Sequence, residues 1–309
     1  GDGSYTIRGT GRKGGATRIL SATYGASGGL AVLGKAAYAA GAVVTGSTTN
    51  FVGGAIACGD THTNNGAING NVEAVKFVNA GTVSGMITPG SVLPLPSSSV
   101  VGYYTSMATP ILYTATLGSI STKLISANSN PYGLPNSNGV YSITVPASST
   151  LTITKSRLVA TLVVTLGPGA TLRLQQANLW EKPAGNFPVL IVNALGAGTI
   201  DMNGFTQQLS EPGTLVNFNP LGTPYEGVWD LDILDLYPTE VRGLVHVLGA
   251  NSVTSSGSNF YLKGVLVTEG KFNPGSNSTY ARDASIASSP PNGYAGTPAL
   301  RDWRWEVVP

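Results

Sequence analysis

Hydrophobic residues along most of the chain recur at every second position, in short runs that end at turn residues. The runs are rich in Val, Ile, Leu, Thr and Tyr, and the clusters between them are rich in Gly, Ser, Asn and Pro. A period of two is typical of β-strands, because successive side chains point to opposite faces. A helical pattern is confined to residues 30–40, where Gly34 limits it to one short helix. We therefore expect an all-β chain with many short strands.

The strands also repeat as larger units. Residues 140–158 align without a gap with residues 161–179, an offset of 21 (161 − 140). A third copy, residues 190–202, matches residues 162–174 at an offset of 28 (190 − 162), and the extra seven positions fit the loop 181–187. A coil of about 21 residues that contains two or three strands predicts a parallel β-helix.

Stacked coils would place like residues in columns, since each strand pairs with the same strand of the next coil. Thr150, Thr171 and Thr199 would form such a column, and Arg173 would lie beside Asp201 as an exposed ion pair. GLVHVLG at position 243 recurs as GVLVTEG at position 264, again at an offset of 21 (264 − 243). A β-sandwich or barrel with similar strands is the alternative. The match runs through turns as well as strands, which favours the solenoid.

The segment 66–87, GAINGNVEAVKFVNAGTVSGMI, echoes itself at an offset of 15 (83 − 68) and is too short for two full coils. We interpret it as two successive faces of one coil that turns at Glu73 and again around residues 79–81, with Gly70 and Gly85 where the coil is narrow or bends. This interpretation predicts inward side chains at Ile68, Val72, Val83 and Ile87.

Three regions follow along the chain. Residues 1–30 are expected to form a β-hairpin that caps the first coil or serves as an assembly segment. Residues 31–280 would form the β-helix, with irregular excursions at 88–139 and 203–242. Residues 281–309, rich in Pro and Trp, would cap the last coil, because an uncovered coil is an open sheet edge.

Composition narrows the function. Of 309 residues, 42% are hydrophobic and only 10% charged, so a core is available and charge offers little defence against self-association. The net charge of +2 comes without a run of like charges, which argues against a nucleic-acid partner. No apolar run is long enough for a membrane span, and Cys58 excludes an intrachain disulfide because it is the single cysteine. The first residues resemble neither a signal peptide nor an initiator, so we expect a processed chain.

Candidate metal and nucleotide chemistry is weak. GTGRKG, residues 9–14, fits a dinucleotide motif only formally, because a strand-like run follows it, and a hairpin loop is the better interpretation. Strand alternation would point Cys58, Asp60 and His62 to the same side, where they could hold a metal. Only one other histidine is present. We therefore predict a turn with a buried thiol, with no cofactor and no metal.

The densest acidic cluster, WDLDILDLYP at 229–238, raises the question of catalysis. Asp230 and Asp232 would share one face of a strand, as paired carboxylates do in polysaccharide lyases and hydrolases. Arg242 and Lys263 from neighbouring coils, with Glu226 and Glu240, would complete such a site. The favoured alternative is a solvent-facing acidic side, with Leu231, Ile233 and Leu236 inward. Convergence of the four candidates Asp230, Asp232, Arg242 and Lys263 in one groove would support catalysis.

Several segments together resemble a known family. They are SYTIRGTGRKGGATRILSATY near the start, NPYG and NGVYSITVPASSTLTITKSRLVATLVV, then FPVLIVNALGAGTID, DLDILDLYPTEVRGLVHVLG, GVLVTEG and the closing PPNGYAGTPALRDWRWEV. The chain resembles large extracellular proteins of bacteria, notably planctomycetes, in which a prepilin-like N-terminal helix precedes a right-handed β-helix. This chain lacks that helix. The resemblance implies a right-handed parallel β-helix, a bacterial surface or secreted location and a non-enzymatic role, and carries over no catalytic residues.

We therefore expect an extracellular structural protein, a self-assembling subunit of a surface fibre, layer or matrix whose partner is itself. The expected contact residues come from the hairpin and the C-terminal tail: Tyr5, Ile7, Ile19, Tyr24, Trp303 and Trp305. The alternative is a β-helix that binds or cleaves polysaccharide at the cell surface. A weaker alternative is an adhesin or minor pilin that presents the two excursions to a receptor.

Overall fold

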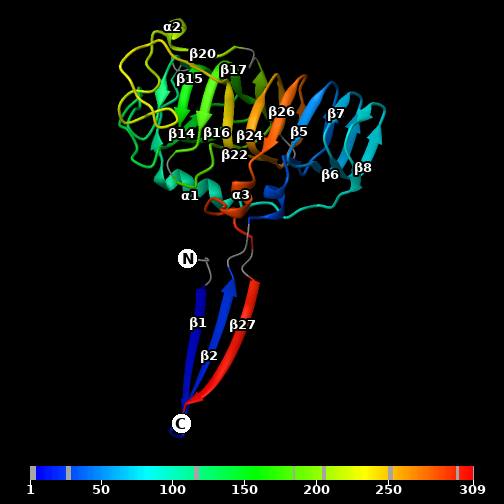
Figure 1. The fold of residues 1–309 in the computed structure, drawn as a ribbon, viewed down its shortest axis with the longest axis vertical. Coiled ribbons are helices and arrows are strands. Elements are labelled where there is room, and N and C mark those ends of the chain that lie inside the picture. The colour runs from blue at the N-terminus through cyan, green and yellow to red at the C-terminus, as the bar shows by residue number, and fades with distance from the viewer. Residues whose placement is uncertain are drawn as a thin grey trace.

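The chain forms a large parallel solenoid and a separate three-stranded antiparallel sheet (Figure 1). The computed structural model describes residues 5–25, 29–114, 118–183, 185–203, 207–249, 253–296 and 299–308. Strands dominate these residues, and the longest sheet is built from parallel pairs. Within the described residues, no helix has both the length and the apolar character needed to cross a membrane. The expectation of an all-β chain with a large parallel sheet is confirmed.

The separate sheet, which we call the stalk, contains β1 (Tyr5–Lys13), β2 (Ala16–Gly25) and β27 (Ala299–Val308). β2 lies in the middle and pairs antiparallel with both neighbours. The hairpin turn is formed by Gly14 and Gly15 alone, whose φ angles are +56° and +80°. Two positive φ angles suit a tight two-residue turn, in which glycine costs no strain. The GTGRKG loop predicted for residues 9–14 is therefore mostly strand.

The solenoid coils have three sides. Six long strands cross from one side to the next: β6 (Ile56–Asn64), β8 (Val72–Asn79), β15 (Thr150–Val159), β17 (Ala170–Glu181), β22 (Glu240–Leu248) and β24 (Tyr261–Thr268). The first side adds β3 (Ala37–Ala39), β10 (Ile87–Pro89), β11 (Thr109–Pro110), β14 (Val140–Val145), β16 (Thr161–Leu166) and β18 (Leu190–Ala194).

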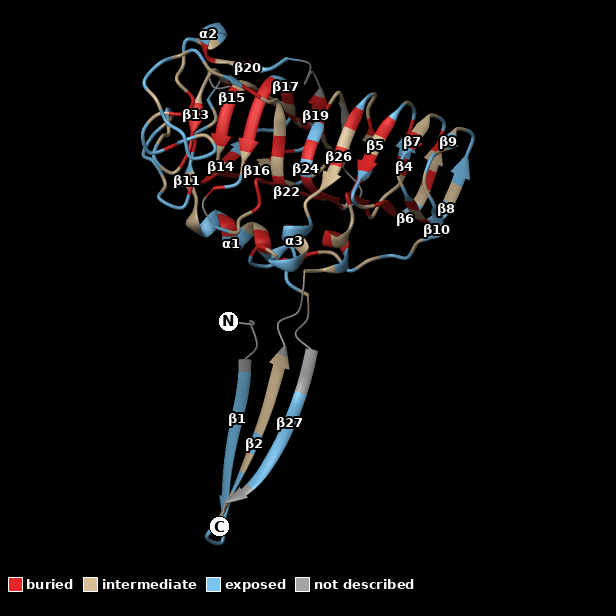
Figure 2. Ribbon diagram, viewed as in Figure 1, coloured by how far each residue is buried: buried red, intermediate tan, exposed pale blue. Residues whose placement is uncertain are grey.

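The second side adds β4 (Val43–Thr45), β12 (Ser119–Ser121), β19 (Gly198–Asn203), β23 (Val253–Ser258) and β25 (Lys271–Pro274). The third side adds β5 (Thr49–Val52), β7 (Ala67–Asn69), β9 (Thr82–Val83), β13 (Leu124–Ile125) and β26 (Ser278–Arg282). Alternate residues of all three sides point inward and form one continuous apolar core, seen as the buried bands of Figure 2.

The strand register reproduces the predicted columns. Thr150 pairs with Thr171, which pairs with Thr199. Arg173 Nε lies 3.0 Å from Asp201 Oδ2, as the column predicts. One detail of the alignment is wrong: Leu158 pairs with Trp180 and not with Leu179, because the register shifts by one position between Thr154 and Ser156.

The coil length is not uniform. Val140 of β14 pairs with Thr161 of β16, an offset of 21 (161 − 140), whereas Val72 of β8 pairs with Ile87 of β10, an offset of 15 (87 − 72). The offset rises to 55 between β18 and β22 (245 − 190), because the intervening chain leaves the solenoid. A single period near 21 therefore describes only part of the coil stack. The interpretation of residues 66–87 as two faces of one coil is wrong, because Ile68 pairs with Val83 on the same side of the next coil.

The coils do not stack in chain order. β3, β4 and β5, the first strands of the solenoid, pair with β24, β25 and β26, the last ones. The first and last coils thus meet inside the stack, and the hairpin and the tail depart from neighbouring coils. The tail pairs with β2 of the stalk and does not cover a coil. The predicted C-terminal cap on the last coil, and the hairpin cap on the first, are therefore wrong.

The last coil at one end, β8 to β10, is open within the described residues. Ile68 and Val72 point inward and are buried, and the partly buried Val83 packs against the core. Ile87 is 49% exposed, although it continues the column of Val72. Ile87 therefore lies in the predicted inward column but is not buried, because no further coil of the described chain stacks on β10.

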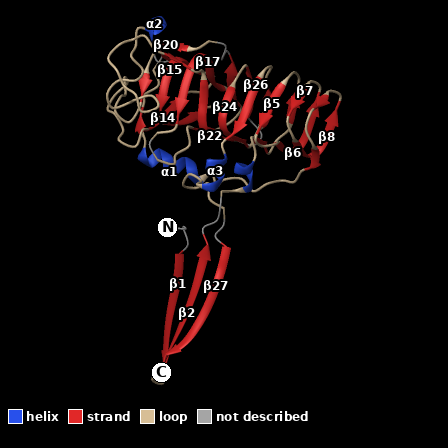
Figure 3. Cartoon of the chain, in the orientation of Figure 1, coloured by secondary structure: helices blue, strands red, loops and turns tan. Residues whose placement is uncertain are grey.

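The excursions behave differently from each other. Residues 91–98 and helix α1 (Ser99–Met107) run along the first side, and β11 to β13 then rejoin the coils. Helices η1 (Ala31–Gly34) and α3 (Ala284–Ser288) cover the same side, as Figure 3 shows. The 203–242 excursion contains α2 (Glu211–Thr214) and the short pair β20 (Leu209–Ser210) and β21 (Leu236–Tyr237).

Candidate functional site

The acidic segment 229–235 does not form the predicted strand. Asp230 Oδ2 accepts a hydrogen bond from Asn219 Nδ2 (3.1 Å), and Asp232 Oδ1 accepts one from the Leu234 amide (2.9 Å). The prediction of inward side chains at Leu231 and Leu236 is wrong: Leu231 is 84% exposed, and Leu236 is exposed as well. Leu231 lies in a loop, where strand alternation does not apply, and Leu236 lies in the short pair β20–β21 outside the coils, so neither faces the solenoid core.

A buried carboxylate organises this loop. Glu211 is fully buried and accepts hydrogen bonds from the Phe218 amide (2.5 Å), the Asp235 amide (3.1 Å) and the Tyr237 hydroxyl (2.7 Å). Burial raises the pKa of Asp235, and the carboxylate of Asp230 raises it further. Within the described residues no cluster of three or more His, Cys, Asp or Glu side chains could hold a metal ion. Glu211, Asp230 and Asp232 each accept hydrogen bonds from other residues of the same excursion.

Arg157 fastens the loop to the third side of the solenoid. Its guanidinium donates to the carbonyl oxygens of Phe218 (2.6 Å), Thr223 (3.0 Å) and Pro224 (2.9 Å), and its Nη2 lies 2.9 Å from Glu181 Oε2. The side chain is 2% exposed. A buried guanidinium is tolerated only where its donors are satisfied, as they are here.

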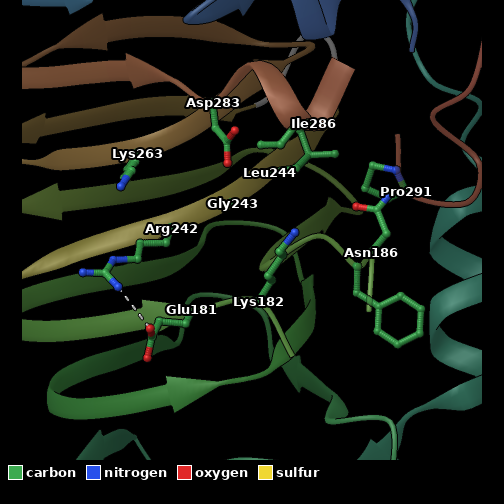
Figure 4. Close-up of a pocket in the computed structure, with 11 residues that line it drawn as sticks. Glu181, Lys182, Asn186, Arg242, Gly243, Leu244, Lys263, Asp283, Ile286 and Pro291 are labelled. Carbon is green, nitrogen blue, oxygen red and sulfur yellow. Dashed lines mark hydrogen bonds and ion pairs between the residues drawn. The ribbon is translucent and has the colours of Figure 1, made fainter. Parts of the chain in front are cut away.

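A cavity of about 350 Å³ lies at the corner between the third and first sides, where the chain passes from Arg242 to Leu244 and under α3. Figure 4 shows Lys263 and Asp283 on one side of it and Lys182 and Asn186 on the other. Of the four predicted catalytic residues, Arg242 and Lys263 line this cavity, and Asp230 and Asp232 do not. The four do not converge in one groove.

Backbone geometry creates the corner. Gly243 has a φ of +141°, which few other residues adopt, and Gly264 pairs with it in the next coil. A Cβ atom on Gly264 would lie 1.8 Å from the carbonyl oxygen of Gly243. The paired glycines let two coils turn sharply at the same place, which leaves room for the cavity beside them.

The cations of the cavity differ in their partners. Arg242 is held by Glu240, by Glu181 (3.3 Å) and by the exposed Glu226 (3.4 Å). Burial lowers the pKa of Arg242, but its hydrogen bond to Glu240 and the charge of that residue outweigh burial, so the pKa lies above its ordinary value. Within the described chain, neither Lys182 nor Lys263 forms an ion pair.

The sequence missed Lys182, Asn186 and Asp283 as members of this cavity. A signal for the first two was present, since the seven extra positions 181–187 interrupt the sequence repeat at this place. Asn186 Nδ2 donates to the backbone oxygen of Ser289 and to its Oγ, so the inserted loop is tied to the end of α3. Asp283 comes from another coil, and no local pattern connects it with the loop.

The predicted grouping of Cys58, Asp60 and His62 on one side of a strand is wrong. The register of β6 shifts between Cys58 and Thr61, at the corner between two sides, so Asp60 points outward while the other two point inward. His62 Nε2 lies 3.0 Å from Thr45 Oγ1, and burial lowers its pKa to about 4. The buried thiol expected for Cys58 is present.

The stalk has one apolar and one polar face. The register brings Ile7, Ala22 and Trp303 together in one row, and Gly9, Leu20 and Trp305 in another row of the same face. Strand alternation assigns the predicted contact residues Ile7, Tyr24, Trp303 and Trp305 to this apolar stalk face, and Ile19 to the opposite face. The side chain of Tyr5 lies outside the described part of the structure.

Comparisons with known proteins identify no family. No protein-family model and no curated protein sequence matches the chain. Similar solved structures include an ice-binding protein from the Antarctic ascomycete Antarctomyces psychrotrophicus, at 8% identity and a TM-score of 0.38, over 82% of this chain and 98% of that one. An ice-binding protein from an Antarctic biological consortium has 11% identity and a TM-score of 0.36, over 83% and 91%.

The competence-associated pilin ComZ from Thermus thermophilus is also similar, at 12% identity and a TM-score of 0.35, over 99% of this chain and 81% of that one. Scores and identities at this level support no inference about the activity of the present chain.

Proposed function

We propose that the protein is an extracellular structural subunit without enzymatic activity, which assembles at the bacterial cell surface through the apolar stalk face. The observation that carries this proposal is the exposure of that face. Ile7, Leu20, Trp303 and Trp305 are between 51% and 60% exposed, in adjacent rows of the same face. Apolar patches of this kind on a soluble protein commonly mark an interaction surface.

A partner would also stabilise the stalk. An apolar face that stays uncovered contributes little hydrophobic free energy, whereas covering it removes apolar surface from water. The opposite face is polar, with Thr6 bound to Thr23 and Arg304 bound to Asp302. Covering the apolar face would therefore stabilise the sheet. The one charged side chain that the register places among these rows, Arg18, lies with its guanidinium over the Trp305 ring, 5.8 Å from its centroid.

The apolar stalk face has the shape to bind a second copy of itself. Gly9 and Gly11 leave open space above β1, in a shallow groove of about 540 Å³ that Arg18, Leu20 and Trp305 border. Two copies related by a two-fold axis could place the ridge of Trp305 in the groove of the other copy. Such an isologous contact uses the same surface twice. The open coil at β8 to β10 offers a second surface for end-to-end growth.

The test is a double substitution of the two stalk tryptophans, Trp303→Ser with Trp305→Ser, followed by sedimentation velocity and electron microscopy. We expect the wild type to form dimers or larger assemblies and the double variant to remain monomeric. Trp229→Ser, at a 49% exposed tryptophan in the 203–242 excursion, is the matched control and should assemble normally. Assembly of the double variant at wild-type concentration would refute the proposed contact.

A carbohydrate-binding role is the second candidate. The observation in its favour is the cavity lined by Arg242 and Lys263. Two other carboxylates, Glu181 and Asp283, line the cavity, but Glu181 is paired with Arg157 and Arg242, and Asp283 accepts a hydrogen bond from the Ser285 amide. Asp230 and Asp232, the carboxylates predicted for catalysis, lie outside the cavity. Within this alternative we therefore propose binding and not cleavage.

A further inference from the structure

The cavity under α3 has no part in the proposed assembly and carries its own chemistry. We propose that it binds the carboxylate of an acidic sugar, a uronic acid unit of a polysaccharide. This inference goes beyond the structural role and names a ligand class for the second candidate. A cavity of about 350 Å³ falls in the usual range of small-molecule sites.

The charge of the cavity favours an anion. Lys182, Lys263 and Arg242 contribute three positive charges, while Glu181 and Asp283 contribute two negative ones, which leaves a net charge of +1 (3 − 2). Arg242 and Glu181 already neutralise each other, at 3.3 Å. Lys182 and Lys263 are exposed at the rim of the cavity and form no ion pair within the described chain, so their ammonium groups are available to a ligand carboxylate.

The remaining polar groups favour a sugar over a simple anion. Asp283 uses Oδ1 to accept a hydrogen bond from the Ser285 amide (2.9 Å), which leaves its second oxygen as an acceptor. Asn186 uses its amide nitrogen on Ser289, which leaves its oxygen as an acceptor. A carboxylate or sulfate ion offers no donor to these acceptors, whereas sugar hydroxyls do.

An apolar wall completes the site. Phe187, Leu244 and Ile286 line the cavity. Sugar rings present C–H groups on their faces, and pockets for small molecules commonly combine apolar walls with a few placed polar groups. The combination of two unpaired ammonium groups, two free acceptors and an apolar wall matches a uronic acid.

The experiment is isothermal titration calorimetry of the full chain with oligogalacturonate and oligoglucuronate, with neutral glucose oligomers, acetate and a sulfated oligosaccharide as comparisons. We expect measurable binding of a uronic acid oligomer only. Lys182→Met with Lys263→Met should weaken that binding at least tenfold, and Asp283→Asn should weaken it by a smaller factor. Lys271→Met, at an exposed lysine of β25 outside the cavity, should leave it unchanged.

Several results would overturn the proposal. These are absence of uronic acid binding, equal binding of neutral or sulfated sugars, full binding by the double lysine variant, or an equal loss in Lys271→Met. Thermal melting of each variant shows whether it is folded. The two proposals fail separately, because the stalk variant should still bind uronic acid and the lysine variant should still assemble.

Discussion

At the scale of single residues, burial decides what a charged or titratable side chain contributes. Arg157 and Arg173 both project from long strands of the solenoid and both form ion pairs, with Glu181 and Asp201. Arg157 is 2% exposed under the 203–242 excursion, and the side chain of Arg173 is 40% exposed. Removal of one partner leaves uncompensated polar groups only where water cannot reach them.

We therefore expect Arg157→Met to lower the free energy of unfolding by about 3 to 5 kcal/mol, because Glu181 and three carbonyl oxygens lose a buried partner. Arg173→Met, the matched control at an exposed pair, should lower it by about 1 kcal/mol or less. Urea unfolding of both variants measures the difference. Equal losses would show that the excursion does not exclude water from Arg157.

Buried histidines should make the fold sensitive to acid. Burial lowers the pKa of His62 to about 4 and that of His246 to about 3, against an ordinary value of 6.5. Between these values and 6.5 the unfolded chain binds protons that the folded chain does not, so stability rises with pH. The stabilisation is therefore complete above about pH 6.5 and is lost as pH falls towards the folded pKa.

For His62 alone, the loss between pH 7 and pH 4.5 should be about 2 kcal/mol. His62→Gln removes the titrating group, so the stability of this variant should fall less over the same range. Urea midpoints of both proteins at the two pH values give the comparison. A variant that loses as much stability as the wild type on acidification would contradict the role assigned to His62.

At the scale of elements, position in the coil stack decides whether an apolar residue is core. Val72 and Ile87 occupy the same inward column on β8 and β10, with β10 paired to β8. Val72 is fully buried and Ile87 is 49% exposed, since no coil of the described chain covers β10. Two β-branched apolar residues in the same column therefore have different environments.

A pair of lysine substitutions tests this difference. Val72→Lys should prevent stable folding of the end coils, because it buries an unpaired charge. Ile87→Lys should change the free energy of unfolding by less than about 1 kcal/mol, because its ammonium group can reach water. Circular dichroism melts of the two variants provide the measurement. Severe destabilisation by Ile87→Lys would mean that the end coil is covered in solution.

At the scale of the whole molecule, the coil order is the main feature that the sequence pattern did not show. The strands β3 to β5 pair with β24 to β26, so segments from opposite ends of the chain lie side by side, as Val52 and Ala281 do. Because the first and last coils pair, the two strands of the hairpin and the C-terminal strand can meet in one stalk. The assembly surface thus depends on contacts between the two ends of the chain.

Engineered disulfides distinguish this order from stacking in chain order. Val52 and Ala281 are register partners on β5 and β26, so Val52→Cys with Ala281→Cys should oxidise to a disulfide. Thr88→Cys with Thr109→Cys should not, because β10 and β11 lie on coils at opposite ends of the stack. Mass spectrometry of non-reduced digests reports both. A crosslink only in the second pair would refute the coil order.

Local patterns in the sequence determined the class of the fold. Alternation along residues 140–202 specified strands, and the offsets of 21 and 28 specified which strands pair, down to the Arg173–Asp201 pair. They could do so because side chains of a strand point to the same face at every second position, and because each coil of a solenoid pairs with the coils next to it. The apolar alternation of the hairpin and the tail also marked four residues of the apolar stalk face.

Tertiary structure alone decided the coil order, the corner at Cys58 and Asp60, and the cavity. The first and last coils pair although they lie far apart in the sequence, at a distance that no sequence repeat sets. Burial of Ile87 depends on whether another coil stacks on β10. The cavity combines Lys182, Lys263 and Asp283 from three different coils. Sequence patterns indicate which nearby strands pair, whereas these features depend on contacts between coils that lie far apart in the sequence.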